Sequence, residues 1–208
     1  MYIPHFNAMS EGDVRPFIES IGSAEIVTVG EDGAPRATLL PILWSPDGGT
    51  VIAHMARANP HWRGIEPDSP CLAIVGGPQA YISPSWYASK AEHGRVVPTW
   101  NYSAVHLSGT ITVHDDPEWV RRAVTDLTDR HEQPRAAPWA VTDAPENYVS
   151  GQLKAIVGLE LTVERVEAKA KLSQNRSEAD RAGVVSGLRA EGGNPAVADA
   201  MDHLPRDP

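Results

Sequence analysis

The chain has 208 residues, of which 41% are hydrophobic and 22% are charged, and its formal net charge is −9. This composition is ordinary for a soluble globular protein with room for one sizeable core. The phosphates of nucleic acid repel so acidic a chain, which disfavours direct DNA binding. The apolar runs are too short to cross a membrane, and the first residues lack the features of a secretory signal. We therefore expect a cytoplasmic protein that does not enter a membrane.

The first third of the chain is predicted to form one helix and three strands. Ser10 begins a segment whose apolar residues recur at helical spacing as far as Ile21. Three β-prone runs follow at 24–30, 35–44 and 50–55, separated by turns that contain Asp-Gly. These patterns indicate antiparallel hairpins.

The rest of the chain continues this mixture of strands and helices. Alternating apolar and polar residues predict strands over 104–114 and 157–163, and shorter strands are expected at 70–76 and 79–83. Residues 84–98 are expected to form an irregular loop. Capping residues and apolar stripes predict helices at 60–66, 117–131, 147–155, from 177 onward and from 194 onward.

Together these elements predict a mainly β fold with flanking helices, either a barrel or a sandwich. We expect one domain with helical insertions over residues 1–190. Gly192 and Gly193 begin a polar segment, so a flexible C-terminal tail is expected over 191–208.

Residues 54–62 form the first candidate for a ligand site. Their sequence, HMARANPHW, ends a strand and begins a helix. Free N–H groups at a helix start attract anions, and a guanidinium binds phosphate bidentately. Because Pro60 lacks an N–H and Asn59 caps the next donors, Arg57 would carry much of any phosphate site. An ordinary capped helix with a surface arginine explains the same local pattern.

Three other segments carry residues suited to ligand binding. Arg36 and Thr38 share one face of the strand 35–44. The run 169–176, KAKLSQNR, is the most basic stretch. Aromatic residues gather on both sides of the 84–98 loop, namely Tyr81, Trp86, Tyr87, Trp100 and Tyr102. Periodicity alone favours an exposed strand face for the first segment. A solvated loop is the alternative for the second, and a packed loop explains the third equally well.

Several kinds of site are disfavoured by the residues. No dinucleotide-binding glycine motif, P-loop or nucleophile elbow is present. His54 and His61 have no cysteine or acidic partners at ligand spacing, so no metal site is expected. Haem ligation by one of the eight histidines stays open. No general acid–base pair stands out, so catalytic residues stay unassigned, and Cys71 lies in an apolar run that predicts a buried thiol.

Five longer motifs resemble, in order, those of the PaiB family. They are MYIP near the start, HMARANPHW, AYISPSWY, VPTWNYSAVHLSG and KAKLSQNRSEAD. The resemblance extends from Met1 to about Leu188. Members of this family are described as FMN-binding negative transcriptional regulators. The resemblance implies an FMN-binding split β-barrel, related to pyridoxamine phosphate oxidases and flavin reductases, and a homodimer with two sites at its interface.

The resemblance also implies which residues bind FMN. They are Arg36, Thr38, Leu39, Leu40 and Pro41 along the flavin ring; His54, Met55 and Ala56 on the strand that leads to the phosphate ligands Arg57 and Asn59; Trp100, Asn101 and Tyr102 from the partner subunit; and Lys171, Gln174 and Asn175 closing the site.

Three functions follow from this resemblance. The first is an FMN-binding protein with a regulatory role, and the second is an FMN-dependent oxidoreductase that uses a small-molecule electron donor. A split barrel that binds haem in place of flavin is the third and most distant. Direct DNA reading is disfavoured again, because the last predicted helix carries Asp199 and Asp202.

Overall fold

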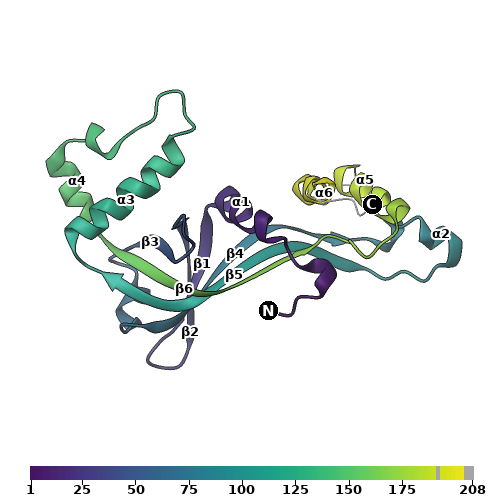
Figure 1. The fold of residues 1–208 in the computed structure, drawn as a ribbon, viewed down its shortest axis with the longest axis horizontal. Coiled ribbons are helices and arrows are strands. Elements are labelled where there is room, and N and C mark those ends of the chain that lie inside the picture. The colour runs from purple at the N-terminus through teal and green to yellow at the C-terminus, as the bar shows by residue number, and fades with distance from the viewer. Residues whose placement is uncertain (191–192, 204–208) are drawn as a thin grey trace. The chain divides into compact units, whose positions relative to one another are not determined.

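The structure is a computed structural model that describes residues 1–190 and 193–203 (Figure 1). The chain divides into two compact units. One comprises 15–75 and 106–167 and is called the barrel unit here. The other comprises 1–14, 76–105 and 168–208 and is called the helical unit.

Six antiparallel strands form a mainly β fold with flanking helices, which confirms the fold class expected from the sequence. The strands are β1 (Ser23–Val29), β2 (Pro35–Trp44), β3 (Thr50–Ala56), β4 (Ser69–Ile82), β5 (Thr99–His114) and β6 (Ile156–Lys171). They close into a barrel in the order β1-β2-β3-β6-β5-β4. The pairings of β1 with β4 and of β3 with β6 that help to close it lie in the barrel unit.

The pairing between β2 and β3 is short. Its register runs from Trp44↔Val51 to Ile42↔Ala53. By contrast, the whole length of β1 pairs with β2, from Ser23↔Pro41 to Val29↔Pro35. Residues 35–41 of β2 therefore lie beyond the described β2–β3 register. The following short 3₁₀ helix, η2 (Pro60–Gly64), contacts β2.

The core of the barrel unit follows from the alternation of its strands. In β3, Val51, Ala53 and Met55 are buried, whereas the residues between them are half-buried. Cys71 on β4 is buried as its apolar run predicts, and burial raises the pKa of its thiol to about 12. This thiol is therefore a packing residue.

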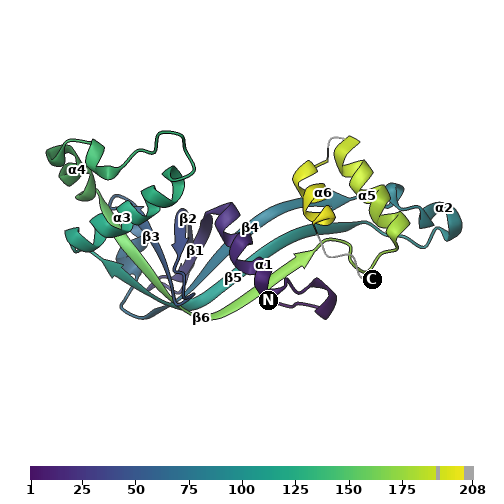
Figure 2. The ribbon, with the colours of Figure 1, turned by 45° about the horizontal axis from the view of Figure 1, so that its top comes forward.

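Three helices belong wholly or largely to the barrel unit, namely α1 (Glu11–Ile21), α3 (Pro117–Glu132) and α4 (Glu146–Leu153). Asp116 caps α3 by accepting from the backbone N–H groups of Glu118 and Trp119. Figures 1 and 2 show α3 and α4 side by side. Val120 of α3 packs with Val149 and Leu153 of α4, and η4 (Val141–Asp143) joins this cluster. The apolar stripe expected for 117–131 thus packs in a hydrophobic cluster of the barrel unit.

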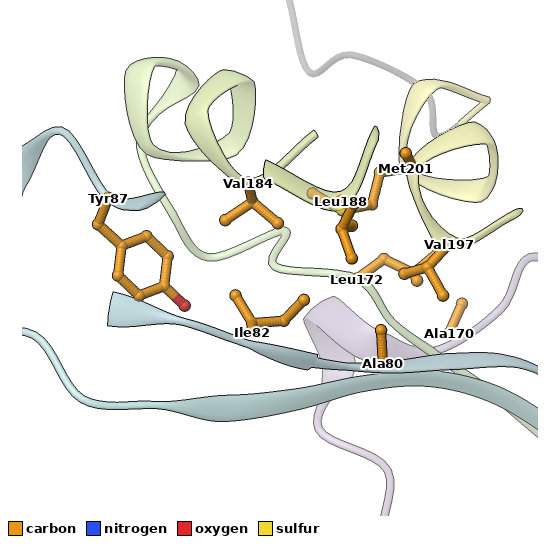
Figure 3. Close-up of a cluster of buried hydrophobic side chains, with 10 residues drawn as sticks. Ala80, Ile82, Tyr87, Ala170, Leu172, Val184, Leu188, Val197 and Met201 are labelled. Carbon is orange, nitrogen blue, oxygen red and sulfur yellow. The ribbon is translucent and has the colours of Figure 1, made fainter. Parts of the chain in front are cut away.

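The helical unit has its own core. Its elements are η1 (His5–Asn7), η3 (Pro84–Trp86), α2 (Ser89–His93), α5 (Glu178–Ala190), α6 (Pro195–Asp202) and the adjoining parts of β4, β5 and β6. Figure 3 shows Val184 and Leu188 of α5 directed toward Ile82 of β4 and Leu172, which follows β6. Val197 and Met201 of α6 complete the cluster.

Helix α6 differs from the flexible tail expected from the sequence. Val197, Ala198 and Met201 are at most 2% exposed. Arg189 of α5 forms ion pairs with Asp199 and Asp202, each at 2.8 Å. The apolar face of the helix explains its order, since burying that face offsets the entropy of fixing the segment. The remainder of the expected tail, 191–192 and 204–208, lies outside the described residues.

Three other elements are longer or more regular than the sequence predicts. One strand, β4, replaces the two expected at 70–76 and 79–83, and it passes through Gly76, Gly77 and Pro78. Strands β5 and β6 extend beyond their alternating segments, and the expected irregular loop contains η3 and α2. No helix in the described part of the chain is long and apolar enough to cross a membrane.

Candidate functional site

A buried polar cluster lies in the barrel unit beside the part of β2 that extends beyond the β2–β3 register. His61 is 4% exposed, and both of its ring nitrogens have hydroxyl partners. Nε2 lies 2.9 Å from Oγ1 of Thr28 and Nδ1 lies 2.8 Å from Oγ1 of Thr38. The side-chain amide of Asn59 donates to the same Thr38 hydroxyl at 3.3 Å. We call Thr28, Thr38, Asn59 and His61 the histidine cluster.

The local sequence explains how His61 is placed. Asn59 caps η2 by accepting from the His61 backbone N–H at 3.0 Å, and Pro60 occupies the first position of the helix. The sequence therefore predicts the start of this helix correctly, although the helix is a short 3₁₀ turn. This turn directs the imidazole toward β1 and β2, where the two threonines lie.

Burial and a nearby cation favour the neutral form of His61. Burial lowers the pKa of His61 first, and the positive charge of Arg36 lowers it further. A neutral imidazole donates through one nitrogen and accepts through the other, and the threonine hydroxyls rotate to match either tautomer. The cluster is therefore satisfied without a formal charge on the histidine.

Arg36 lies next to this cluster in a tightly confined space. A Cβ atom added to Gly30 would lie 2.8 Å from Cζ of Arg36, and one added to Gly64 would lie 3.0 Å from its Nη1. The two glycines thus make room for the guanidinium. Arg36 forms an ion pair with Asp32 at 3.3 Å, and the Asp32 carboxylate is mostly exposed to solvent. Such exposed pairs are weak, so an anionic ligand can compete for Arg36.

Arg57 is engaged within the protein. Its guanidinium forms a two-pronged ion pair with Asp115, and it also donates to the carbonyls of Lys154 at 2.9 Å and Ile156 at 3.1 Å. Hydrogen bonding from Arg57 lowers the pKa of Asp115. The guanidinium therefore ties the end of β3 to β6 and to the end of β5. The sequence predicts Arg57 as a phosphate ligand, but these contacts already use most of its N–H donors.

The other expected residues of the barrel unit differ in exposure. On β2, Leu40 is buried, whereas Leu39 and Pro41 are exposed and Leu39 is 67% exposed. On β3, Met55 is buried and Ala56 is exposed. Burial lowers the pKa of His54, and its Nδ1 has no hydrogen-bond partner among the described residues.

Three expected residues from β5 lie in the helical unit. Trp100 is 47% exposed, and its indole N–H donates to Gln79 at 3.0 Å. Asn101 is fully buried and exchanges hydrogen bonds with the hydroxyl of Ser173. The ring of Tyr102 lies beneath the ammonium of Lys169, 5.1 Å from its centroid.

The remaining three expected residues surround the end of β6 in the same unit. Lys171 donates to the Thr99 hydroxyl and, at 2.7 Å, to the carbonyl of Trp100. Gln174 accepts from the Leu172 N–H and donates to the Ala170 carbonyl, so it holds the turn. Asn175 is exposed and lines a cavity together with Lys171 and Asn101.

The structure therefore gathers the expected residues into two groups. Arg36, Thr38 and Asn59 surround His61 in the barrel unit, whereas Asn101, Lys171 and Asn175 line a cavity in the helical unit. Sequence reasoning considered His61 only as a metal or haem ligand and missed Thr28. The motif that contains His61 could have indicated its role from the sequence, whereas no motif marks Thr28.

A closed antiparallel barrel with a basic, hydrogen-bonding cluster beside one strand is a fold suited to holding an anionic cofactor. Residues 1–165 match the family described as "Putative FMN-binding domain", and the chain belongs to this family. It is 34% identical over 194 residues to the Bacillus subtilis protein named "Protease synthase and sporulation protein PAI 2". That alignment covers 92% of this chain and 90% of the relative, which confirms the resemblance to the PaiB family.

Solved structures show the same fold. The FAD- and heme-binding protein of Mycobacterium smegmatis superposes with a TM-score of 0.60, and the match covers 86% of this chain and 80% of that one at 19% identity. A conserved hypothetical protein of Mycobacterium tuberculosis gives a TM-score of 0.59 at 13% identity, covering 86% and 95%. At these identities the likeness is one of fold.

Family membership makes FMN the cofactor of this chain. The residues present fit it. Arg36 and the amide of Asn59 supply donors suited to a phosphate, next to a histidine cluster that needs no further partner. The edge of β2 over residues 36–40, beyond its register with β3, offers backbone donors and acceptors to a polar ring.

Proposed function

We propose that this protein is an FMN-dependent oxidoreductase that binds the FMN phosphate at Arg36 and Asn59. The observation that carries the phosphate site is the position of Arg36, which lies between two glycines beside the histidine cluster and is paired only with an exposed aspartate among the described residues. When bound, FMN supplies hydride and single-electron transfer.

Different side chains contact the phosphate and hold those contacts in position. Arg36 gives a bidentate contact and a positive charge, and Asn59 adds an amide donor. The histidine cluster fixes Thr38 and the η2 turn, so the donors are held in place before the ligand arrives. Leu39, Leu40 and Pro41 lie on the strand beside the flavin ring. His54, Met55 and Ala56 lie at the end of β3, where they pair with β6.

We also propose that the protein is a homodimer. An apolar surface spans β1 and β2, where Val27 pairs with Ala37 and Val29 pairs with Pro35. Val29 is 58% exposed and Leu39 67% exposed, and Ala37 is exposed between them, whereas the exposed Glu25 lies opposite Leu39. Exposed apolar side chains on one strand face, with a charged residue at the edge, are typical of an interface, and a second copy is the partner that the PaiB resemblance implies.

A regulatory role, as the PaiB family description carries, would not involve DNA reading by this chain. The apolar face of α6 is buried in the core of the helical unit, and its Asp199 and Asp202 pair with Arg189. A helix fixed in this way and carrying two carboxylates is unsuited to a DNA groove. We place the protein in the cytoplasm, where soluble electron donors such as nicotinamide nucleotides are available.

Anaerobic titration of the FMN-loaded protein with NADH or NADPH tests the redox proposal. We expect the flavin absorbance to bleach with one of these donors and to return on admission of air. Stable FMN binding without reduction by either nucleotide would contradict the proposed use of a nicotinamide donor. A sequence-specific complex with duplex DNA at physiological salt would contradict our view of α6.

A further inference from the structure

A cavity lies wholly within the helical unit. Its volume is about 330 Å³, at the lower end of the range for small-molecule sites and small for a whole flavin nucleotide. Lys169, Lys171 and Arg176 line it, and no acidic side chain is among the lining residues. The aromatic and aliphatic side chains of Tyr2, Phe6 and Val97 form another part of its wall.

The three cations are brought together by the fold. Lys169 is 8% exposed, donates to the carbonyl of Tyr2 at 3.1 Å and lies over the ring of Tyr102. Lys171 is fixed by Thr99 and Trp100, and both burial and the charge of Lys169 act to lower its pKa. Placing like charges together in a partly buried space is costly unless an anion is present.

Arg176 is held by an aromatic ring and lies near one carboxylate. Its guanidinium lies 4.6 Å from the ring centroid of Tyr87. The nearby carboxylate of Asp180 is buried and accepts hydrogen bonds from the backbone and the hydroxyl of Ser89, at 2.9 and 2.8 Å. The charge of Arg176 helps to lower the pKa of Asp180, while the carboxylate oxygens of Asp180 remain hydrogen-bonded to Ser89.

The turn that carries Arg176 is strained and braced. Ser173 adopts a φ of 65°, a conformation that residues other than glycine seldom take. Two hydrogen bonds with the buried Asn101 hold the Ser173 side chain, and the Gln174 side chain binds the backbone of Ala170 and Leu172, just before Ser173. Strain that the surroundings hold in this way is characteristic of ligand sites.

We propose that this cavity binds a small organic anion, a carboxylate or a phosphate carried on an apolar body. Lys171 and Arg176 contact the anionic group, while Tyr2, Phe6 and Val97 contact the apolar body. Asn101 and Gln174 position the turn and do not touch the ligand. The lining residues belong to the helical unit, whereas Arg36 belongs to the barrel unit, so the two proposals are tested with different variants.

Isothermal titration of the FMN-loaded full-length protein with benzoate and with phenyl phosphate tests the site. We expect one of these anions to bind at one per chain, more weakly at high salt, while the uncharged benzamide does not bind. Lys171→Gln should weaken binding about tenfold or more, because a charge-assisted contact is lost. Lys90→Gln, which changes an exposed lysine of the same unit, should leave it unchanged.

A second pair of variants avoids damage to the fold. Val97 is 65% exposed, so Val97→Glu should fold normally and repel the anion, whereas Val97→Gln keeps the shape without the charge. The absence of binding by both anions, or equal binding by the Glu and Gln variants, would overturn the proposal. Loss of FMN in Lys171→Gln, measured by flavin absorbance, would assign the cavity to the flavin and also overturn it.

Discussion

Arg36 and Arg57 differ in what already holds them. Arg57 has four contacts with Asp115 and two backbone carbonyls, all within the barrel unit. Arg36 has a single ion pair with the exposed Asp32 and lies beside the histidine cluster. A ligand phosphate would have to displace several internal partners from Arg57 and only one from Arg36. At the residue scale, Arg36 is therefore more available to a phosphate than Arg57.

Arg36→Ala should weaken FMN binding by about 1.5–3 kcal/mol, because a charge-assisted phosphate contact is lost. Riboflavin, which lacks the phosphate, should bind nearly as before, and fluorescence titration with each flavin measures the difference. Arg57→Ala is the matched comparison. It should lower the unfolding temperature and affect both flavins alike. A selective loss of FMN in Arg57→Ala, with none in Arg36→Ala, would reverse the assignment.

His61 should make stability depend on pH in the mildly acidic range. Burial and Arg36 lower its pKa in the folded state, whereas an unfolded histidine titrates near 6.5. Below about pH 6.5 the unfolded chain therefore binds the proton first, so the free energy of unfolding decreases as the pH falls. His61→Gln should reduce this decrease between pH 7.5 and 5.5 in urea unfolding. His54 and His106, whose pKa values burial also lowers, will retain part of it.

The elements follow the sequence closely where periodicity and capping agree. The capping residues Asn59, Asp116 and Asn194 mark the starts of η2, α3 and α6, and β2 has the bounds that its hairpin turns predict. Gly76, Gly77 and Pro78 predict a break that does not occur in β4. The strand continues there because β4 pairs with its neighbours in the barrel, β1 and β5, and this pairing outweighs the local preference for a turn.

The sequence predicts the fold better than it predicts the candidate site. Asp115 lies 58 positions from Arg57, and Thr28 lies 33 positions from His61. No spacing rule reports such contacts, so Arg57 looks free and Thr28 looks ordinary in the sequence. The motif that contains Asn59 and His61 nevertheless marks the correct turn. Its chemistry becomes clear only when β1 and β2 bring the threonines to it.

The contact between α5 and η3 depends on glycine. A Cβ at Gly187 would lie 2.4 Å from the ring of Trp86. Gly187→Ala should therefore destabilise the protein by about 1–3 kcal/mol, as overpacking does. Gly151 of α4 has nothing within 4 Å of an added Cβ, so Gly151→Ala should leave stability unchanged or raise it by about 0.5–1 kcal/mol. Thermal unfolding of both variants measures this, and equal stability would contradict the close contact.

At the scale of the whole molecule, association and charge are the decisive properties. Leu39→Glu places a carboxylate on the apolar β1–β2 surface, at a side chain that is 67% exposed and so tolerates the change. We expect the variant to elute as a monomer with unchanged circular dichroism, while the unmodified protein elutes as a dimer. A monomeric unmodified protein, or a variant that stays dimeric, would contradict this interface.

The net charge of −9 fits a protein that binds small molecules better than one that reads DNA. Family membership gives FMN as the cofactor, and we propose that Arg36 and Asn59, beside the histidine cluster of the barrel unit, bind its phosphate. The regulatory description of the PaiB family is then compatible with an indirect role that depends on the flavin or on the organic anion proposed above.

The most direct test of this account is the absorption spectrum of the purified protein after incubation with excess FMN and removal of the unbound ligand. We predict a flavin spectrum corresponding to about one FMN per chain, with occupancy reduced in Arg36→Ala and retained in the Gly151→Ala control. A colourless protein after this treatment, or a haem Soret band in place of the flavin bands, would contradict the central claim.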